Sequence, residues 1–269
     1  MPRLIDSHVH LNDDAFSHDR GAVIDRAFRA GVESMVVPGV DFESWGRIRE
    51  LADKYRAIHP AYGLHPMFLA NHAPEHVDAL SSWLDEPRVV AVGEIGLDFH
   101  VDGLDHDQQR LYFTRQLELA RERKLPVIVH ARGALEEVSL TLRRTCLIGG
   151  VVHSFSGSEQ QARRLWDIGF HLGIGGPVTY ERAQRLRRIV ASMPIEFLLL
   201  ESDAPDQPDA AHRGERNEPA RVTEVLRCIA VLRGETEAEV AHATSANASR
   251  LFNLDAPAYG PLPPQPSIP

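Results

Sequence analysis

Alternation between short apolar runs and longer charged segments is the feature that most constrains the fold of this chain. Eight runs rich in valine and isoleucine are separated by segments in which apolar residues recur at helical spacing. The runs cover residues 3–10, 33–40, 57–66, 88–96, 125–131, 149–155, 169–176 and 195–203. Near-continuous apolar strands alternating with helices are typical of a parallel sheet covered by helices. Eight such units predict an α/β fold of the (β/α)8 TIM-barrel type in a single domain.

An open, doubly wound sheet is the alternative architecture, but no glycine fingerprint for a dinucleotide follows the first run. Within the longest charged segment, one helical face is predicted from the spacing of Leu111, Phe113, Leu117 and Ala120. Residues 236–253 predict one further helix or two. We expect the barrel to occupy residues 1–254, and the proline-rich residues 255–269 to form a disordered tail.

The charge of the chain limits its relation to nucleic acid. Its 269 residues carry a formal net charge of −9, which argues against a protein that coats nucleic acid non-specifically but allows an enzyme that contacts a few phosphates locally. Only two cysteines occur, and the first residues lack the basic and apolar pattern of a secretory signal. No apolar run approaches the roughly 20 residues needed to cross a bilayer. We therefore expect a cytoplasmic protein that does not contact membranes.

Side chains able to bind metal stand where the predicted strands end. In the first run, "IDSHVH", the side chains of Asp6, His8 and His10 are expected on one face, because alternate residues of a strand point the same way. The carboxyl ends of the strands of a parallel barrel meet at one rim, together with the loops that follow them. We expect six candidate metal ligands to converge there: His8, His10, Glu94, His130, His153 and Asp203.

Four imidazoles and two carboxylates are more than one catalytic zinc-type ion uses, since such an ion typically takes three protein ligands. Two ions that share a bridging carboxylate would use all six, and this ligand mixture suits Zn, Mn, Fe or Co. Two ions roughly 3.5–4 Å apart can activate a water and stabilise an in-line phosphoryl displacement. Asp6 and Glu201 are expected behind the ligands as buried carboxylates that orient metal-bound histidines. Gly93 and Gly96 would let the main chain turn closely around Glu94.

A series of motifs runs in order along the chain: "IDSHVH", "GLHP", "AVGEIGLD", "PVIVHAR", "VVHSFSG", "GIGGPVTY", "LESDAP", "RGERNEP" and "TSANASRLF". With these motifs, residues 4–253 resemble the TatD family of metal-dependent deoxyribonucleases and hydrolases. The resemblance implies two divalent ions, usually Mg2+, and removal of nucleotides from DNA 3′ ends. A histidine-rich site should also bind Mn2+ or Zn2+. The resemblance also implies a division of the ligands: His8, His10 and Asp203 for the first ion, His130 and His153 for the second, and Glu94 shared. Asp203 would then be the general base.

Single-stranded DNA or a DNA 3′ end is the partner that this resemblance implies, and no obligate protein partner is expected. Arginine suits bidentate recognition of phosphate, and aromatic rings can stack on bases. The candidates for phosphate binding are His65, Arg132 and Arg213, with Arg216 and Asn217 as further candidates, and those for base stacking are Phe155 and Tyr180.

Two departures from the family pattern concern the surroundings of the ligands. The family commonly carries "HSRDA" where this chain has "HARGA", so Gly133 replaces an acidic residue, and Met67 stands where a histidine commonly follows "GLHP". An alternative function therefore stays open, namely hydrolysis of a small phosphoester or of an acyl or aminoacyl bond by the same activated water. A non-catalytic binding protein is a third possibility, which the complete ligand set disfavours.

Overall fold

Eight parallel strands follow one another around a barrel in the computed structural model of the chain, which describes residues 3–145 and 147–254. The strands are β1 (Leu4–Asp6), β2 (Val32–Pro38), β3 (Ile58–Tyr62), β4 (Ala91–Asp98), β5 (Val127–Arg132), β6 (Gly150–Val152), β7 (Phe170–Ile174) and β8 (Leu198–Leu200). Each lies on one of the eight predicted runs, and neighbours in sequence are neighbours in the sheet. The predicted (β/α)8 barrel is confirmed, and the open doubly wound sheet is wrong.

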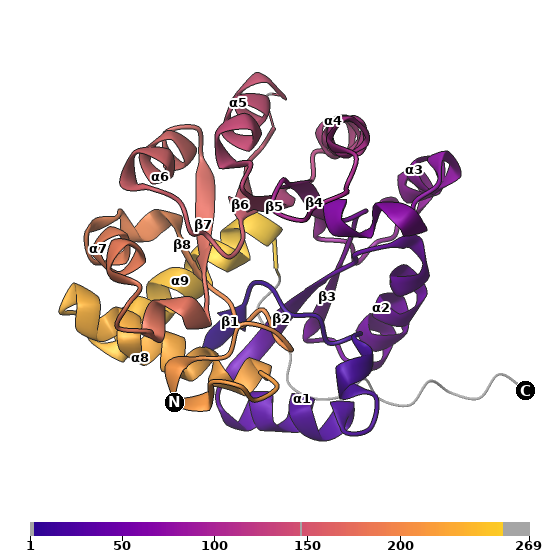
Figure 1. Ribbon diagram of the computed structural model, residues 1–269. Coiled ribbons are helices and arrows are strands. Elements are labelled where there is room, and N and C mark those ends of the chain that lie inside the picture. The colour runs from indigo at the N-terminus through magenta and orange to yellow at the C-terminus, as the bar shows by residue number, and fades with distance from the viewer. Residues whose placement is uncertain (1–2, 146, 255–269) are drawn as a thin grey trace, which may run out of the picture.

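Helices surround the strands in chain order, as Figure 1 shows in a view along the barrel. They are α1 (Arg20–Arg29), α2 (Phe42–Lys54), α3 (Pro74–Trp83), α4 (His106–Arg123), α5 (Leu135–Thr145), α6 (Glu159–Trp166), α7 (Gln184–Ser192), α8 (Val222–Arg233) and α9 (Glu237–Phe252). Short 3-10 turns lie in the loops: η1 (Asp14–Phe16), η2 (Pro66–Asn71), η3 (Gly176–Thr179), η4 (Ile195–Phe197), η5 (Ala210–His212) and η6 (Pro219–Arg221).

Local sequence signals explain where several helices begin. The Asp41 carboxylate accepts a hydrogen bond from the main-chain N–H of Ser44 at 2.9 Å, and Asp105 starts α4 in the same way. Residues 236–253 form one helix, α9, which begins after the capping residue Thr236. In α4, the prediction for Leu111 is wrong: its side chain is 61% exposed, because buried Tyr112, Gln109 and Gln116 lie on the inner face instead.

The ends of the sheet meet through the chain that follows β1 and β8. The N–H of Ser7 donates to the carbonyl of Leu200 at 2.9 Å, and the N–H of Asp203 donates to the carbonyl of His8 at 2.9 Å. The barrel is therefore closed at the carboxyl ends of its strands, next to the predicted ligands. The proline-rich segment predicted as a disordered tail lies outside the described residues.

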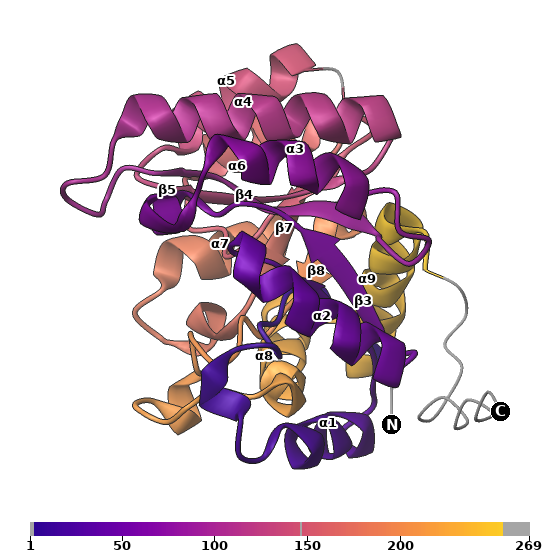
Figure 2. The same ribbon diagram turned by 90° about the vertical axis from the view of Figure 1, so that its right-hand side faces the viewer.

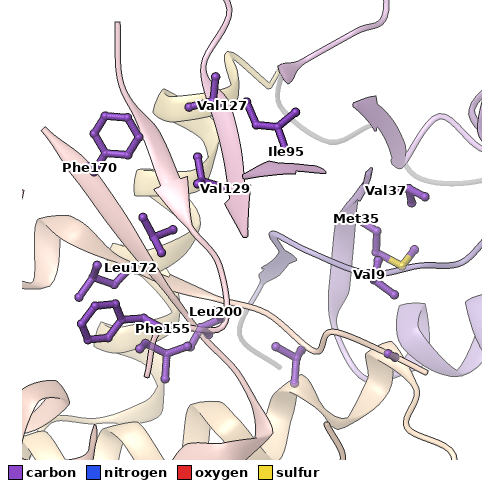
Figure 3. Packing of buried hydrophobic residues seen from close by; sticks show 14 of the residues in the cluster. Val9, Met35, Val37, Ile95, Val127, Val129, Phe155, Phe170, Leu172 and Leu200 are labelled. Atoms are coloured by element: carbon purple, nitrogen blue, oxygen red, sulfur yellow. The ribbon is translucent and has the colours of Figure 1, made fainter. Parts of the chain in front are cut away.

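Two apolar layers hold the barrel. A large cluster joins the outer faces of the strands to the helices, and Figure 3 shows part of it, including Met35, Val37, Val129 and Leu172. A smaller cluster fills the barrel with one side chain from each of seven strands: Ile5, Val36, Ala61, Ala91, Ile128, Val151 and Leu199. Ala248 and Phe252 of α9 pack against this inner layer. In Figure 2, α9 lies at the end of the barrel opposite the loops that follow β4 and β8.

Among the helices of the described ranges, none combines the length and the apolar character needed to cross a membrane.

Candidate metal centre

All six predicted metal ligands lie at the carboxyl ends of the strands. Glu94 and His130 lie within β4 and β5, whereas the other ligands follow the last residue of their strand. The strand β1 ends at Asp6, so the expectation that the first two histidines sit on a strand face is wrong in detail. The chain after β1 nevertheless continues between β2 and the segment that follows β8. The N–H of Val9 donates to the carbonyl of Val36 at 3.1 Å, and the N–H of His10 donates to the carbonyl of Ala204 at 2.8 Å.

Glu94 occupies the centre of the site, and each of its two oxygens faces a different group of imidazoles. Oε1 lies 2.8 Å from Nε2 of His153 and 3.2 Å from Nδ1 of His130. Oε2 lies 3.2 Å from Nε2 of His8 and 3.6 Å from Nε2 of His10. The two groups are those that the resemblance to the family assigned to separate ions, and the Glu94 carboxylate lies between them.

Asp203 completes the group around His8 and His10. Its Oδ1 lies 3.5 Å from Nε2 of His8 and 3.6 Å from Nε2 of His10. Its other oxygen, Oδ2, accepts a hydrogen bond from the side-chain amide of Gln207. One carboxylate oxygen is therefore held by the protein, while the other faces the imidazoles.

Buried atoms without hydrogen-bond partners indicate that these residues fit divalent cations. Oε1 of Glu94 accepts no hydrogen bond within the described part of the chain, although three ring nitrogens lie within 3.2 Å of it. Nδ1 of His8 and Nδ1 of His153 are also buried without a partner among the same residues, but the ring atoms of these two histidines that face Glu94 are the Nε2 atoms. Nitrogen and oxygen atoms that approach one another without hydrogen-bond geometry are expected where they converge on a cation, and imidazole with carboxylate suits first-row divalent metals.

The charges around Glu94 support the same interpretation. Burial raises its pKa, but the imidazoles of His153, His65 and His8 outweigh this effect and hold the pKa well below its usual range. Burial alone would lower the pKa of His153, yet the carboxylate of Glu94 raises it to about 10. In the chain without metal, a proton on His153 therefore balances the buried carboxylate, a charge that a bound cation would balance instead.

The two carboxylates expected behind the ligands take different positions. Oε1 of Glu201 lies 3.8 Å from Nδ1 of His153 and accepts a hydrogen bond from the N–H of Ser154 at 2.6 Å. Asp6 accepts hydrogen bonds from main-chain N–H groups of His8 and Ser202, and from the Ser202 hydroxyl at 2.6 Å. Burial raises the pKa of Glu201 to about 8 and that of Asp6 to about 7. Glu201 thus stands beside an imidazole, whereas Asp6 fastens β1 to the chain after β8.

Asp98 is a site residue that the sequence interpretation missed. Its carboxylate is fully buried, and Oδ2 lies 2.9 Å from Nε2 of His130. Burial opposes ionisation, but the hydrogen bond from His130 and two from main-chain N–H groups lower the pKa of Asp98 to about 2. When the His130 ring is neutral and Nε2 donates to Asp98, Nδ1 carries the lone pair that faces Glu94. Alternation along "GEIGLD" places Glu94 and Asp98 on one strand face, so the spacing contained this signal.

His65 also faces Glu94, but its hydrogen bonds distinguish it from the four histidines among the candidate ligands. Burial lowers its pKa to about 4, so the ring is neutral at pH 7. Nδ1 accepts a hydrogen bond from the N–H of Met67 at 3.1 Å, which leaves the ring proton on Nε2, 2.8 Å from Oε1 of Glu94. His65 therefore presents an N–H donor, rather than a lone pair, to the site.

A bulge in β4 aims Glu94 at the site. The register against β5 shifts between Val92 and Ile95, and the N–H of Glu94 donates instead to the carbonyl of Gly39 at 2.8 Å. Gly96 then adopts φ = 143°, with its Cα so close to β5 that a Cβ atom would overlap the carbonyl oxygen of His130.

We expect Gly96→Ala to lower the free energy of unfolding by at least about 2 kcal/mol, because it adds both backbone strain and a clash with β5. Gly103→Ala is the matched control, since Gly103 has φ = 83° but no atom within 4 Å of the added Cβ. Urea denaturation of both variants checks the prediction. Equal losses of stability would show that the approach of Gly96 to His130 is unimportant.

A cavity of about 970 Å³ opens above the candidate ligands. His65 and Arg132 line it, as do Arg182 and Arg185, two arginines that the sequence interpretation did not single out. Met67 and Phe68 line the same cavity and keep 39% and 40% of their surface exposed. Arg213 is not among the lining residues and lies on an exposed loop between η5 and η6.

The further candidates for substrate contact have partners inside the protein. Arg216 forms two ion-pair contacts of 2.8 Å with Asp19, and the buried amide of Asn217 donates to the carbonyl of Ser202 at 2.8 Å. Phe155 lines the cavity but is only 3% exposed. The Tyr180 hydroxyl donates to the carbonyl of Pro208 at 3.0 Å. These contacts hold the loops around the cavity in place.

Comparison with known proteins agrees with the fold. A model of the family "TatD related DNase" matches residues 5–253. The uncharacterized metal-dependent hydrolase YjjV of Escherichia coli K12 is 40% identical over 255 residues, which are 94% of this chain and 98% of that protein. The 3′-5′ ssDNA/RNA exonuclease TatD of Salmonella typhimurium LT2 is 35% identical over 260 residues, which are 93% of this chain and 99% of that protein.

A solved structure shows the same fold at similar length. The crystal structure of YjjV from Escherichia coli K12 superposes with a TM-score of 0.91 at 39% identity, over 94% of this chain and 99% of that one. The family match covers every candidate ligand, from His8 to Asp203. The chain therefore belongs to the TatD family of metal-dependent hydrolases.

Proposed function

We propose that the protein is a two-metal nuclease that removes nucleotides from the 3′ ends of single-stranded DNA. The observation that carries the proposal is the position of Glu94, whose two oxygens face two separate groups of imidazoles. One ion would be held by His8, His10, Asp203 and Glu94, and the other by His130, His153 and Glu94. The Salmonella relative named as a 3′-5′ ssDNA/RNA exonuclease supports the choice of substrate.

Bound divalent ions would supply Lewis-acid activation of water and of the phosphoryl group. The residues of the chain then have distinct tasks. Asp203 keeps Oδ1 toward the reacting centre, because Gln207 holds Oδ2, and it takes the proton of the attacking water. His65 donates its Nε2 proton to a phosphate oxygen, and Asp98 keeps His130 in the tautomer that presents Nδ1.

The wall of the cavity fits a substrate with several phosphates. Among the described residues, three arginines that line the cavity form no ion pair with a carboxylate: Arg132, Arg182 and Arg185. The guanidinium of Arg182 lies 5.4 Å from the Tyr180 ring, and Arg185 donates to the carbonyl of Ser156 at 2.9 Å. In a chain of net charge −9, arginines free of carboxylates at this cavity favour a polyanion. Phosphate binding by Arg213 and a cytoplasmic location remain predictions from the sequence.

Cleavage of end-labelled single-stranded DNA tests the proposal. Metal-stripped protein is refilled in turn with Mg2+, Mn2+ and Zn2+, and stepwise loss from the 3′ end that depends on metal is the expected result. Folded protein that cleaves no DNA with any of these metals would contradict the proposal. A panel of small phosphoesters, esters and aminoacyl compounds would then test the alternative hydrolase.

Removing both cavity arginines in Arg182→Ala/Arg185→Ala is expected to raise KM for a labelled oligonucleotide about tenfold. The physical reason is the loss of charge-assisted phosphate contacts of roughly 1.5 kcal/mol in total. Hydrolysis of bis(p-nitrophenyl) phosphate, which has one phosphate, should change little. Steady-state kinetics on the two substrates gives the comparison.

Two single variants complete this experiment. Arg143→Ala, in the last turn of α5, removes an exposed arginine outside the cavity and should change neither KM. Arg213→Ala shows whether that loop arginine contacts a longer strand. Parallel losses on both substrates in the double variant would indicate damage to the site and count against phosphate binding by these arginines.

A further inference from the structure

The seam between β3 and β4 opens at the rim of the barrel, next to the candidate metal centre. These strands pair only at Ala61 with Ala91 and at Tyr62 with Val92, although β4 continues to Asp98. Beyond the last pair, main-chain N–H and C=O groups on this side of β4 and after β3 need other partners, because buried peptide groups are costly when unpaired.

Gln116 of α4 supplies those partners after β3. Its Oε1 accepts from the N–H of Leu64 at 2.7 Å, and its Nε2 donates to the carbonyl of Leu64 at 3.1 Å. The side-chain amide thus bonds to Leu64 as a peptide group of a neighbouring strand would. Leu64 directly precedes His65, so Gln116 fixes the main chain from which that imidazole projects.

Gln109, two turns earlier on the same helix, does the same for Asp98. Its Oε1 accepts from the N–H of Asp98 at 2.8 Å, and its Nε2 donates to the carbonyl of Asp98 at 2.9 Å. Both glutamines are 0% exposed, and residues seven apart lie on one face of a helix. This face of α4 lies against β4 (Figure 1).

We propose that Gln109 and Gln116 are positioning residues through which α4 sets two different parts of the site. Gln109 holds Asp98, and Asp98 holds His130 in the tautomer that can bind an ion. Gln116 holds His65, which donates to phosphate and binds no ion. The proposal rests on the proposed metal centre, and it requires that the two glutamines control separate properties.

The Gln109 half is tested by titrating metal-stripped protein with Mn2+ and with Zn2+ in a calorimeter. In Gln109→Met, one of two bound ions should lose affinity by about 10- to 100-fold, the scale measured when a residue behind a metal ligand is replaced. The other ion should bind as in the wild type. Wild-type affinity for both ions in folded Gln109→Met would overturn this half.

The Gln116 half is tested by the binding of inorganic phosphate to the metal-loaded protein. In Gln116→Met, both ions should bind with wild-type affinity, while phosphate should bind about tenfold more weakly. Unchanged phosphate affinity, or loss of an ion, would overturn this half, as would wild-type protein that binds no phosphate. Neither titration uses a nucleic acid, so a failure of the proposed nuclease activity is seen separately, in the cleavage assay.

Asn247→Leu is the matched control for the loss of a buried amide. Asn247 is 3% exposed and donates to the carbonyls of Ile195 and Leu198, at the opposite end of β8 from the site. It should lower thermal stability without changing either titration. Where a methionine variant does not fold, Gln109→Glu and Gln116→Glu keep one acceptor and replace the amide donor with a second carboxylate oxygen. The expected changes are in the same direction, and wild-type behaviour of these variants overturns the proposal.

Discussion

Glu94→Gln is expected to reduce metal-dependent turnover by about 10⁴-fold or more, the scale seen when a catalytic unit loses a member. The carboxylate is 2% exposed, and its two oxygens face the two groups of imidazoles. An amide of the same shape replaces one anionic oxygen with an N–H2 donor and removes the negative charge shared between the proposed ions. Both ions should therefore bind more weakly, and metal content after dialysis should fall together with DNA cleavage.

Glu86→Gln is the control for this change. Glu86 accepts a hydrogen bond from the Tyr62 hydroxyl at 3.1 Å and pairs with Arg49, and it does not line the cavity. Its replacement should leave metal content and cleavage unchanged. Folded Glu94→Gln protein that retains two ions and full activity would refute the two-metal proposal. Loss of a single ion with residual activity would show that Glu94 serves one ion and does not bridge.

The order of the strands and the region of the site could be predicted from the sequence because both follow from local patterns. Apolar runs such as residues 125–131 are buried on both faces, which only a covered parallel sheet explains. Once the sheet is a barrel, the residues that end its strands must meet at one rim, whatever the lengths of the loops. Asp98 was within reach of the same argument, since it follows Glu94 by four residues in one strand.

Other features depend on contacts between distant residues and leave no local signal. Arg216 stands in a loop motif, and only the fold reveals that Asp19, 197 residues away, is its partner. Arg182 and Arg185 lie among other charges, and their exposure to the cavity follows from the place around the barrel of α7 and of the turn before it. The buried amides of Gln109 and Gln116 have the spacing of an inner helix face, but their partners belong to a seam between β3 and β4 that opens only in three dimensions.

Asp203→Asn is expected to lower kcat by about 10³-fold, within the range that general-base catalysis contributes, while KM changes by less than about threefold. Asparagine keeps the shape of the side chain, and Oδ2 of Asp203 is held by Gln207 in the wild type. The group lost is therefore the carboxylate oxygen Oδ1, 3.5 Å from Nε2 of His8, which in the proposed site would both face an ion and accept a proton. The cavity arginines proposed to bind phosphate are unchanged, so substrate affinity should persist.

Single-turnover cleavage at saturating metal separates the two roles of Asp203. If kcat falls while both ions remain bound, the lost function is proton transfer, and the acidic limb of the pH–rate profile should disappear with it. If one ion is lost and excess metal restores the rate, Asp203 acts only as a ligand, and another group must be the base. Asp206→Asn tests the effect of a nearby charge. Asp206 lines the same cavity, and its N–H donates to the carbonyl of Asp203, but its carboxylate faces neither group of imidazoles. In Asp203→Asn, a large rise in KM with little change in kcat would place Asp203 in substrate binding instead of catalysis.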